Sequence, residues 1–141
     1  MEMGRLALDK TAKKIYWIDY PSTGDKVIRR ADLTGANVET IHTFADQTTY
    51  YRLCGIDSRE GGRLYWHAWK KNIMYSTDKN GGFLSAILST GTSSTYLGWS
   101  CSPTLDTVND RLVWMNGTID KYFSIGLSGG LEAILTRQAR P

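Results

Sequence analysis

The chain has 141 residues, about one ordinary domain, and its content of 41% hydrophobic and 22% charged residues is typical of a globular protein rather than a disordered one. The net charge is only +3, and the mild basic bias of residues 49–97 indicates a solvated face, so no nucleic-acid partner is expected. No apolar run approaches the roughly 18 residues of a membrane helix, so no membrane contact is expected.

A repeat of about 48 residues runs through the chain. The approximate repeats are 4–48, 49–97 and 98–141, within a single domain that covers 1–141. Three sets of landmarks keep the period: Trp17, Trp66 and Trp114, spaced by 49 and 48 residues; Asp9, Asp57 and Asp106, spaced by 48 and 49; and Gly35, Gly82 and Gly130, spaced by 47 and 48.

Each repeat contains four short apolar segments separated by polar or glycine-bearing turns, which predicts four antiparallel strands. The first strands end at Asp9, Asp57 and Asp106. The remaining predicted strands are, in chain order, Ile15–Ile18, Val27–Asp32 and Val38–Ile41; Leu64–His67, Ile73–Asp78 and Leu84–Leu88; and Leu112–Met115, Tyr122–Leu127 and Leu131–Leu135.

The second strand of each repeat lacks the alternation of a strand with one wet face. In the first repeat it reads KIYWID, which places apolar residues on both faces. A propeller blade has such strands, because each blade packs between two neighbours. We therefore expect Ile15 and Trp17 to face one neighbour, and Tyr16 and Ile18 to face the other. The fold class is all-β, with three four-stranded propeller blades; a sandwich of about twelve strands would explain the strands but not the period.

The repeat resembles the YWTD repeat, also called the LDL-receptor class B repeat. The likeness is carried by Leu6-Ala7-Leu8-Asp9, Ile15-Tyr16-Trp17-Ile18-Asp19 and Arg30–Gly35, and more weakly by the later repeats. The motif Asp is kept only at Asp19, and Ala68 and Asn116 occupy its other positions. The structural motif residues are Asp9, Tyr16, Trp17, Asp19, Asp57, Tyr65, Trp66, Asp106 and Trp114.

Three blades leave two blade faces open, and exposed apolar surface of that size is not tolerated in a stable monomer. The resemblance implies six blades in a ring. We therefore expect a homodimer in which two chains contribute three blades each around a two-fold axis. The alternative is a fragment of a longer propeller. No signal peptide is visible in MEMGRLALD, so the chain is either intracellular or a mature or excised piece.

The resemblance implies non-enzymatic recognition of a protein ligand in an extracellular setting. Aromatic and charged residues in loops are the candidate contacts: Tyr20, Asp25, Trp69, Lys70, Lys71 and Trp99. An aromatic surface also suits sugar rings, so a lectin with paired sites in a homodimer is one alternative. A metal-dependent, lactonase-like hydrolase is the other.

No catalytic constellation, metal site or cofactor motif is predicted, and the repeated Asp residues are expected to cap turns. Of the histidines, His67 is expected in the core and His42 in solvent. Asn116-Gly117-Thr118 is a glycosylation sequon, which has meaning only in a secreted chain. Cys54 and Cys101 are too few for a disulfide scaffold, and a single disulfide and two buried thiols remain open alternatives.

Overall fold

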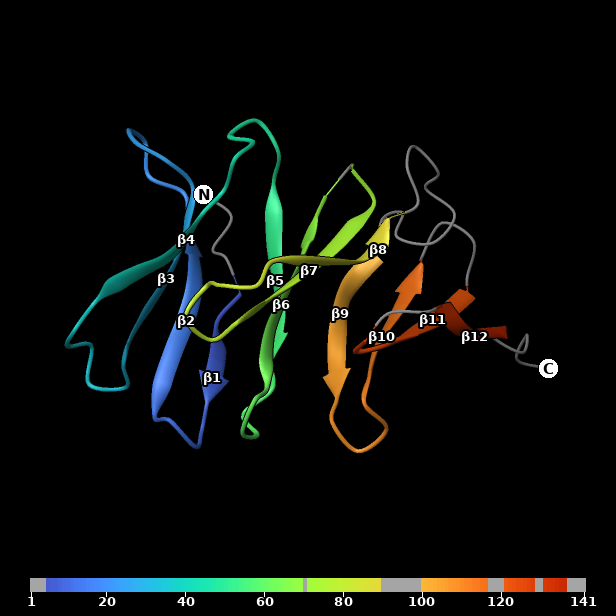
Figure 1. The fold of residues 1–141 in the computed structure, drawn as a ribbon. Helices are drawn as coiled ribbons and strands as arrows, with labels where there is room; N and C mark the ends of the chain where they lie inside the picture. Colours follow the sequence, from blue (N-terminus) through green and yellow to red (C-terminus); the bar gives the residue numbers. More distant parts are fainter. Residues whose placement is uncertain (1–4, 70, 90–99, 117–120, 129–130, 137–141) are drawn as a thin grey trace.

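Three antiparallel sheets of four strands lie side by side in the computed structural model, each in the order of its sequence (Figure 1). The structure describes residues 5–69, 71–89, 100–116, 121–128 and 131–136, with the backbone alone for 100–102 and 131–136. No helix occurs in these ranges, and hence none that could cross a membrane. The predicted all-β class is confirmed, and three separate sheets exclude a two-sheet sandwich.

The sheets correspond to the three repeats and are called blades 1 to 3. Blade 1 contains β1 (Ala7–Asp9), β2 (Lys14–Asp19), β3 (Val27–Asp32) and β4 (Glu39–Thr43); blade 2 contains β5 (Tyr51–Ile56), β6 (Arg63–Ala68), β7 (Ile73–Asp78) and β8 (Ser85–Ser89); blade 3 contains β9 (Ser100–Asp106), β10 (Arg111–Asn116), β11 (Lys121–Gly126) and β12 (Leu131–Thr136). Blade 2 lies between the other two (Figure 1).

The joint between blades 1 and 2 is a continuous apolar core. Tyr16 and Ile18 of β2 contribute to it from one side, and Leu64 and Trp66 of β6 contribute from the other. Tyr65, between these two β6 residues, belongs instead to a second core, which includes Trp114 of blade 3. Strand β6 is therefore buried on both faces, which explains why its sequence does not alternate.

Among the strands at the edges of the blades, β4 and β5 differ from the boundaries that the sequence predicts. Strand β4 runs over Glu39–Thr43 rather than Val38–Ile41, because a bulge lies opposite the step from Ile28 to Arg29. Strand β5 begins at Tyr51, six residues before the repeated Asp57. Its ring is buried in the joint and stacks on Phe44 at a centroid distance of 3.8 Å.

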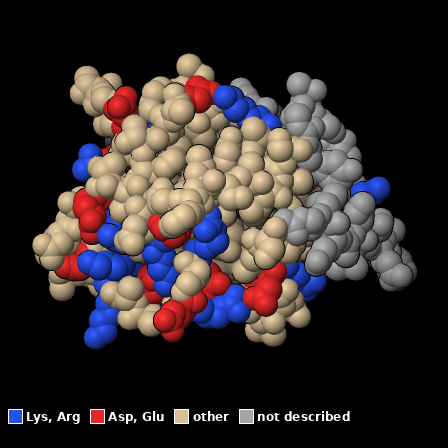
Figure 2. Space-filling model, in the orientation of Figure 1, with Lys and Arg blue, Asp and Glu red and all other residues tan. Residues whose placement is uncertain are grey.

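Ion pairs and polar contacts line the lower end of the blades. Lys79 of blade 2 pairs with Asp9 of blade 1 at 2.8 Å. Arg59 of blade 2 pairs with Asp57 of its own blade and with Asp110 of blade 3, both at 2.7 Å. Figure 2 shows this mixed-sign band along the lower edge of the molecule. These contacts join neighbouring blades at their lower end.

Candidate ligand-recognition surface

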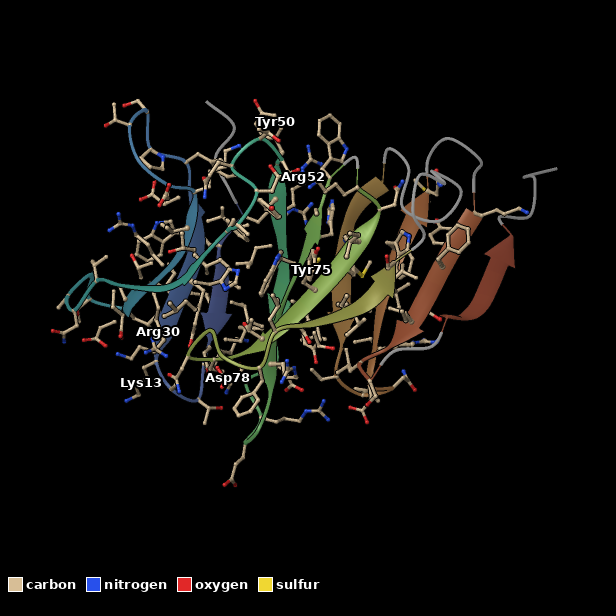
Figure 3. All side chains as sticks on the ribbon, turned by 45° about the horizontal axis from the view of Figure 1, so that its top comes forward. Lys13, Arg30, Tyr50, Arg52, Tyr75 and Asp78 are labelled. Carbon is tan, nitrogen blue, oxygen red and sulfur yellow. The ribbon has the colours of Figure 1, made fainter. Side chains whose placement is uncertain are left out.

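Aromatic and cationic side chains gather at the upper end of blades 1 and 2, opposite the charged band. The recognition cluster comprises Tyr20 and Lys26 from the β2–β3 connection, Tyr50 and Arg52 at the start of β5, and Trp69 directly after β6. Figure 3 shows Tyr50 and Arg52 together at this end, with Arg30 and Asp78 at the other. The blade topology brings these residues together because strand β2 ends, and strands β3 and β5 begin, at the same end.

Tyr50 is the centre of the recognition cluster and is 52% exposed. Its ring centroid lies 6.1 Å from that of Tyr20 and 6.2 Å from that of Trp69, which it meets edge to face. The Lys26 ammonium lies 5.0 Å from the Tyr50 centroid, and the Arg52 guanidinium lies 5.6 Å from that of Trp69. Both distances are within the range of cation–π contacts.

Backbone contacts hold the cluster in place. The Tyr51 N–H donates to the Tyr20 hydroxyl at 2.7 Å, and that hydroxyl donates in turn to the Tyr51 carbonyl. The Trp69 N–H donates to the Tyr50 carbonyl at 2.7 Å, and the Lys26 ammonium donates to the Thr49 carbonyl at 3.0 Å. The Tyr20 side chain is therefore held by the backbone of β5, and the backbones of Tyr50 and Trp69 are held by each other, before any ligand arrives, which reduces the entropy lost on binding.

The six predicted contact residues have different positions. Tyr20 and Trp69 belong to the recognition cluster. Asp25 is exposed in the β2–β3 connection, and no contact joins it to the cluster among the described residues. Lys71 pairs with Asp46 and holds the pKa of that carboxyl far below its usual range. Lys70 and Trp99 lie outside the described residues.

Sequence reasoning missed Lys26, Tyr50 and Arg52 as cluster members. Tyr50 and Arg52 were visible as an aromatic and a cation at the start of the second repeat. Lys26 gave no signal, since it is one of many lysines next to a strand. Only the pairing of blades 1 and 2 places it beside two tyrosines.

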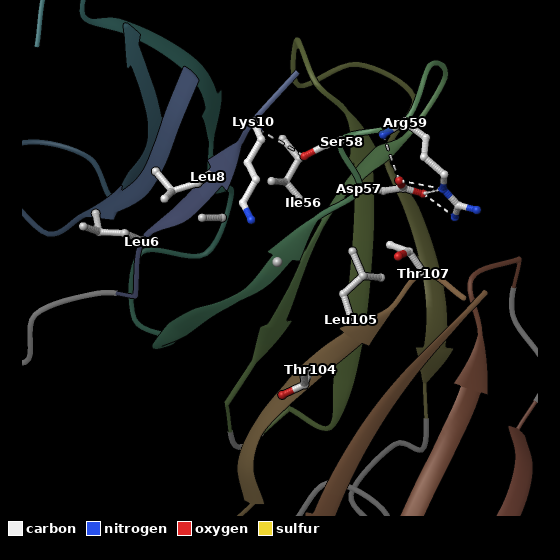
Figure 4. Close-up of a pocket in the computed structure, with 12 residues that line it drawn as sticks. Leu6, Leu8, Lys10, Ile56, Asp57, Ser58, Arg59, Thr104, Leu105 and Thr107 are labelled. Carbon is white, nitrogen blue, oxygen red and sulfur yellow. Dashed lines mark hydrogen bonds and ion pairs between the residues drawn. The ribbon is translucent and has the colours of Figure 1, made fainter. Parts of the chain in front are cut away.

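A separate hollow of about 450 Å³ lies among the inner strands of all three blades (Figure 4). Leu8, Ile56 and Leu105 line it with Lys10 and the Asp57–Arg59 pair. The Arg59 guanidinium binds both Asp57 oxygens and lowers the pKa of that carboxyl. The charge of Asp57 is thus already neutralised, and among the described residues no three His, Cys, Asp or Glu side chains gather to hold a metal.

The repeated carboxylates bind the turns that follow them. Asp9 accepts from the N–H groups of Thr11 and Ala12 at 3.1 and 3.0 Å. Asp57 accepts from the N–H of Arg59 at 3.0 Å, and Asp106 from that of Val108 at 3.2 Å. This is the geometry of a turn cap, in which Asp satisfies backbone donors two or three residues further on.

Four other polar residues have positions that bear on the predictions. Asn116 is fully buried, and a glycan is bulky and needs the surface, so this packing argues against glycosylation at the sequon.

His67 is buried as expected. The expectation for His42 is wrong, because its ring packs 5.2 Å from that of Trp66. Cys54 is a free thiol whose sulfur lies 3.8 Å from His67 Nδ1, and the Cys101 side chain lies outside the described part.

Comparison with known proteins gives a fold relationship. No family model and no curated protein matches the chain. Among solved structures, a chain from the crystal structure of a nidogen/laminin complex is similar, with a TM-score of 0.67 and 21% sequence identity. The match covers 92% of this chain and 46% of that chain, so this chain spans about half the length of its neighbour. At this identity the likeness establishes a shared fold.

Proposed function

We propose that the chain is a non-enzymatic recognition module, a three-blade YWTD-type propeller segment that binds a protein partner through the recognition cluster. The observation that carries the proposal is the half-exposed Tyr50, whose ring lies near those of Tyr20 and Trp69 and beside the Lys26 ammonium, while Arg52 lies over the Trp69 ring. The structural neighbour comes from a protein–protein complex, which supports this class of function. An extracellular setting belongs to the same proposal and rests on the motif resemblance.

The chemistry of the recognition cluster favours a partner surface with carboxylates beside apolar side chains. Aromatic residues and arginine are the residue types that contribute most to binding at protein interfaces. Lys26 and Arg52 place two positive charges beside the rings of Tyr50 and Trp69, and positive charge at a binding surface attracts an acidic group on the partner. An acidic, partly apolar peptide segment is therefore the expected ligand.

Peptide binding tests this function. We expect the chain to select, from an array of random 15-residue peptides, sequences enriched in Asp or Glu next to an apolar residue. Tyr50→Ala and Trp69→Ala should each weaken the selected peptides by roughly tenfold or more, as expected for hot-spot aromatics. Phe83→Ala is the matched control, because Phe83 is an exposed ring in the β7–β8 turn. Equal binding by all variants would contradict the proposal.

A carbohydrate-binding lectin is the second candidate, because the exposed ring of Tyr50 beside Trp69 also forms a platform for a sugar ring. Binding on a glycan array that is lost in Trp69→Ala, without peptide selection, would favour the lectin. The lactonase-like alternative gains no support from the described residues, since their repeated carboxylates cap turns.

The proposal includes a homodimer of two three-blade chains. It rests on the two blade faces at the ends of the row, against which no described blade lies. The neighbour's length also fits, since one copy of this chain matches just under half of it.

A further inference from the structure

Each blade has a face that is directed toward the blade before it in sequence. Strand pairing defines the equivalent positions on this face: Leu8 pairs with Ile15, Ile56 with Leu64, and Leu105 with Leu112. Ile56 and Leu64 are buried in the core between blades 1 and 2. Leu105 and Leu112 belong to the core between blades 2 and 3. Blade 1 has the same positions, but no described blade lies against them.

The unpartnered face of blade 1 has apolar residues at the positions whose counterparts in blades 2 and 3 are buried. Leu8 is 50% exposed, and Trp17, the counterpart of the buried Trp66 and Trp114, is only partly buried. Leu33 is 55% exposed; its N–H donates to the residue before β2, as the Leu127 N–H does to the residue before β10. Leu127 packs into the core between blades 2 and 3. This surface, defined by Leu8, Ile15, Trp17 and Leu33, is called the Trp17 face.

Blade 3, at the opposite end of the row of blades, has a face that is directed away from blade 2. On blade 3, Val113 and Met115 point away from blade 2, since Leu112 and Trp114 point toward it. Tyr122, which pairs with Met115, is 37% exposed on the same side. In blades 1 and 2 the positions of Val113 and Met115 are held by residues that contact the following blade, such as Tyr16 and Ile18.

The Trp17 face carries a charged pair at a position where the faces buried within the chain carry an aromatic ring. Opposite Trp66 stands Tyr75, and opposite Trp114 stands Phe123; each pair of rings is stacked, at 6.1 and 5.8 Å. Opposite Trp17 stands Arg29, whose guanidinium pairs with Asp19 at 2.8 Å. A charged pair keeps an exposed blade face soluble, and its burial in a joint costs free energy that an apolar pair would not.

We propose that the Trp17 face binds the Val113–Met115 face of a second copy of this chain, and that the Asp19–Arg29 pair makes the two joints between chains reversible. This inference rests on the proposed homodimer and adds which faces meet and why the contact is reversible. Both faces belong to one chain, and two copies match the length of the structural neighbour, so two equivalent joints would close the ring.

Sedimentation velocity over a range of concentrations tests the inference. The chain should shift from its 15.8 kDa monomer to twice that mass as concentration rises. Trp17→Ser should raise the dissociation constant at least about tenfold, as loss of a central aromatic contact does. Phe83→Ser, at an exposed aromatic site away from both faces, should leave it unchanged. Far-UV circular dichroism reports whether each variant keeps its sheets.

A second variant is expected to strengthen the dimer, so its effect cannot be explained by misfolding. Asp19→Asn with Arg29→Phe installs the residues that blade 3 has at these positions, Asn116 and Phe123. Replacing the ion pair by these uncharged residues, which cost less free energy to bury in the joint, should lower the dissociation constant by roughly tenfold. A wild-type dimer that neither variant alters would keep the homodimer and overturn this inference. A monomer at all concentrations, or growth beyond dimers, would overturn both, while peptide binding by the recognition cluster would stand.

Discussion

Trp66→Ala is expected to lower the free energy of unfolding by about 3–5 kcal/mol, the range for removal of a fully buried aromatic side chain. The Trp66 ring is 1% exposed and contacts aromatic residues of two blades. It stacks on Tyr75 of its own blade and meets His42 and Phe44 of blade 1 at 5.2 and 6.1 Å. Alanine would leave a cavity in the joint between blades 1 and 2, which urea unfolding at neutral pH would register as a lower midpoint.

Trp17→Ala is the matched control, because Trp17 holds the equivalent position on the unpartnered face of blade 1. At a concentration where the chain is monomeric, we expect it to cost well under half of the Trp66→Ala effect, since less apolar area is lost from a partly exposed site. Equal costs for the two substitutions would contradict the assignment of Trp17 to an open face.

Stability should fall by about 3 kcal/mol as pH drops from about 6.5 to about 4, because of His67. Burial, with a smaller contribution from the charges of Arg52 and Arg5, lowers the pKa of this imidazole from 6.5 to about 4. The neutral ring is therefore favoured in the folded chain. Between these pH values the unfolded chain binds a proton that the folded chain does not, so the stabilisation is complete above the unfolded pKa and lost as pH falls. Urea midpoints measured from pH 7 to pH 4 would report the slope.

His67→Met tests the origin of this slope, because Met115 holds the equivalent position in blade 3. We expect the variant to lose most of the pH dependence in this window. A smaller part should remain, since burial also lowers the pKa of His42. An unchanged slope in His67→Met would show that other groups are responsible.

The repeat made most of the fold predictable. Strands β3 and β7 begin and end at the predicted residues, because their apolar runs are bounded by polar turns on both sides. The two-sided burial of β6 also followed from its sequence. Tyr51 could not be placed in β5 from the pattern, because its burial depends on stacking against Phe44 of another blade. The bulge that displaces β4 likewise leaves no clear mark in the residues.

The recognition surface was predictable in part. Trp69 and Tyr20 stood out as aromatics in loops, and both belong to the cluster. Lys71 pairs with Asp46, 25 positions earlier in the chain, and the sequence gives no sign of this pair. Contacts between blades decide which loop charges remain available, and a single repeat does not encode them.

Cross-linking of two single-cysteine chains shows whether the Trp17 face of one chain meets the Val113–Met115 face of another. Cys54 and Cys101 are first replaced by serine; one chain then carries Ile15→Cys on the Trp17 face and the other carries Met115→Cys on blade 3. With a short bismaleimide, the mixture should give a covalent dimer that contains one chain of each kind, and neither chain alone should give one. Dimers formed by the Met115→Cys chain alone, or no covalent dimer in the mixture, would contradict the account.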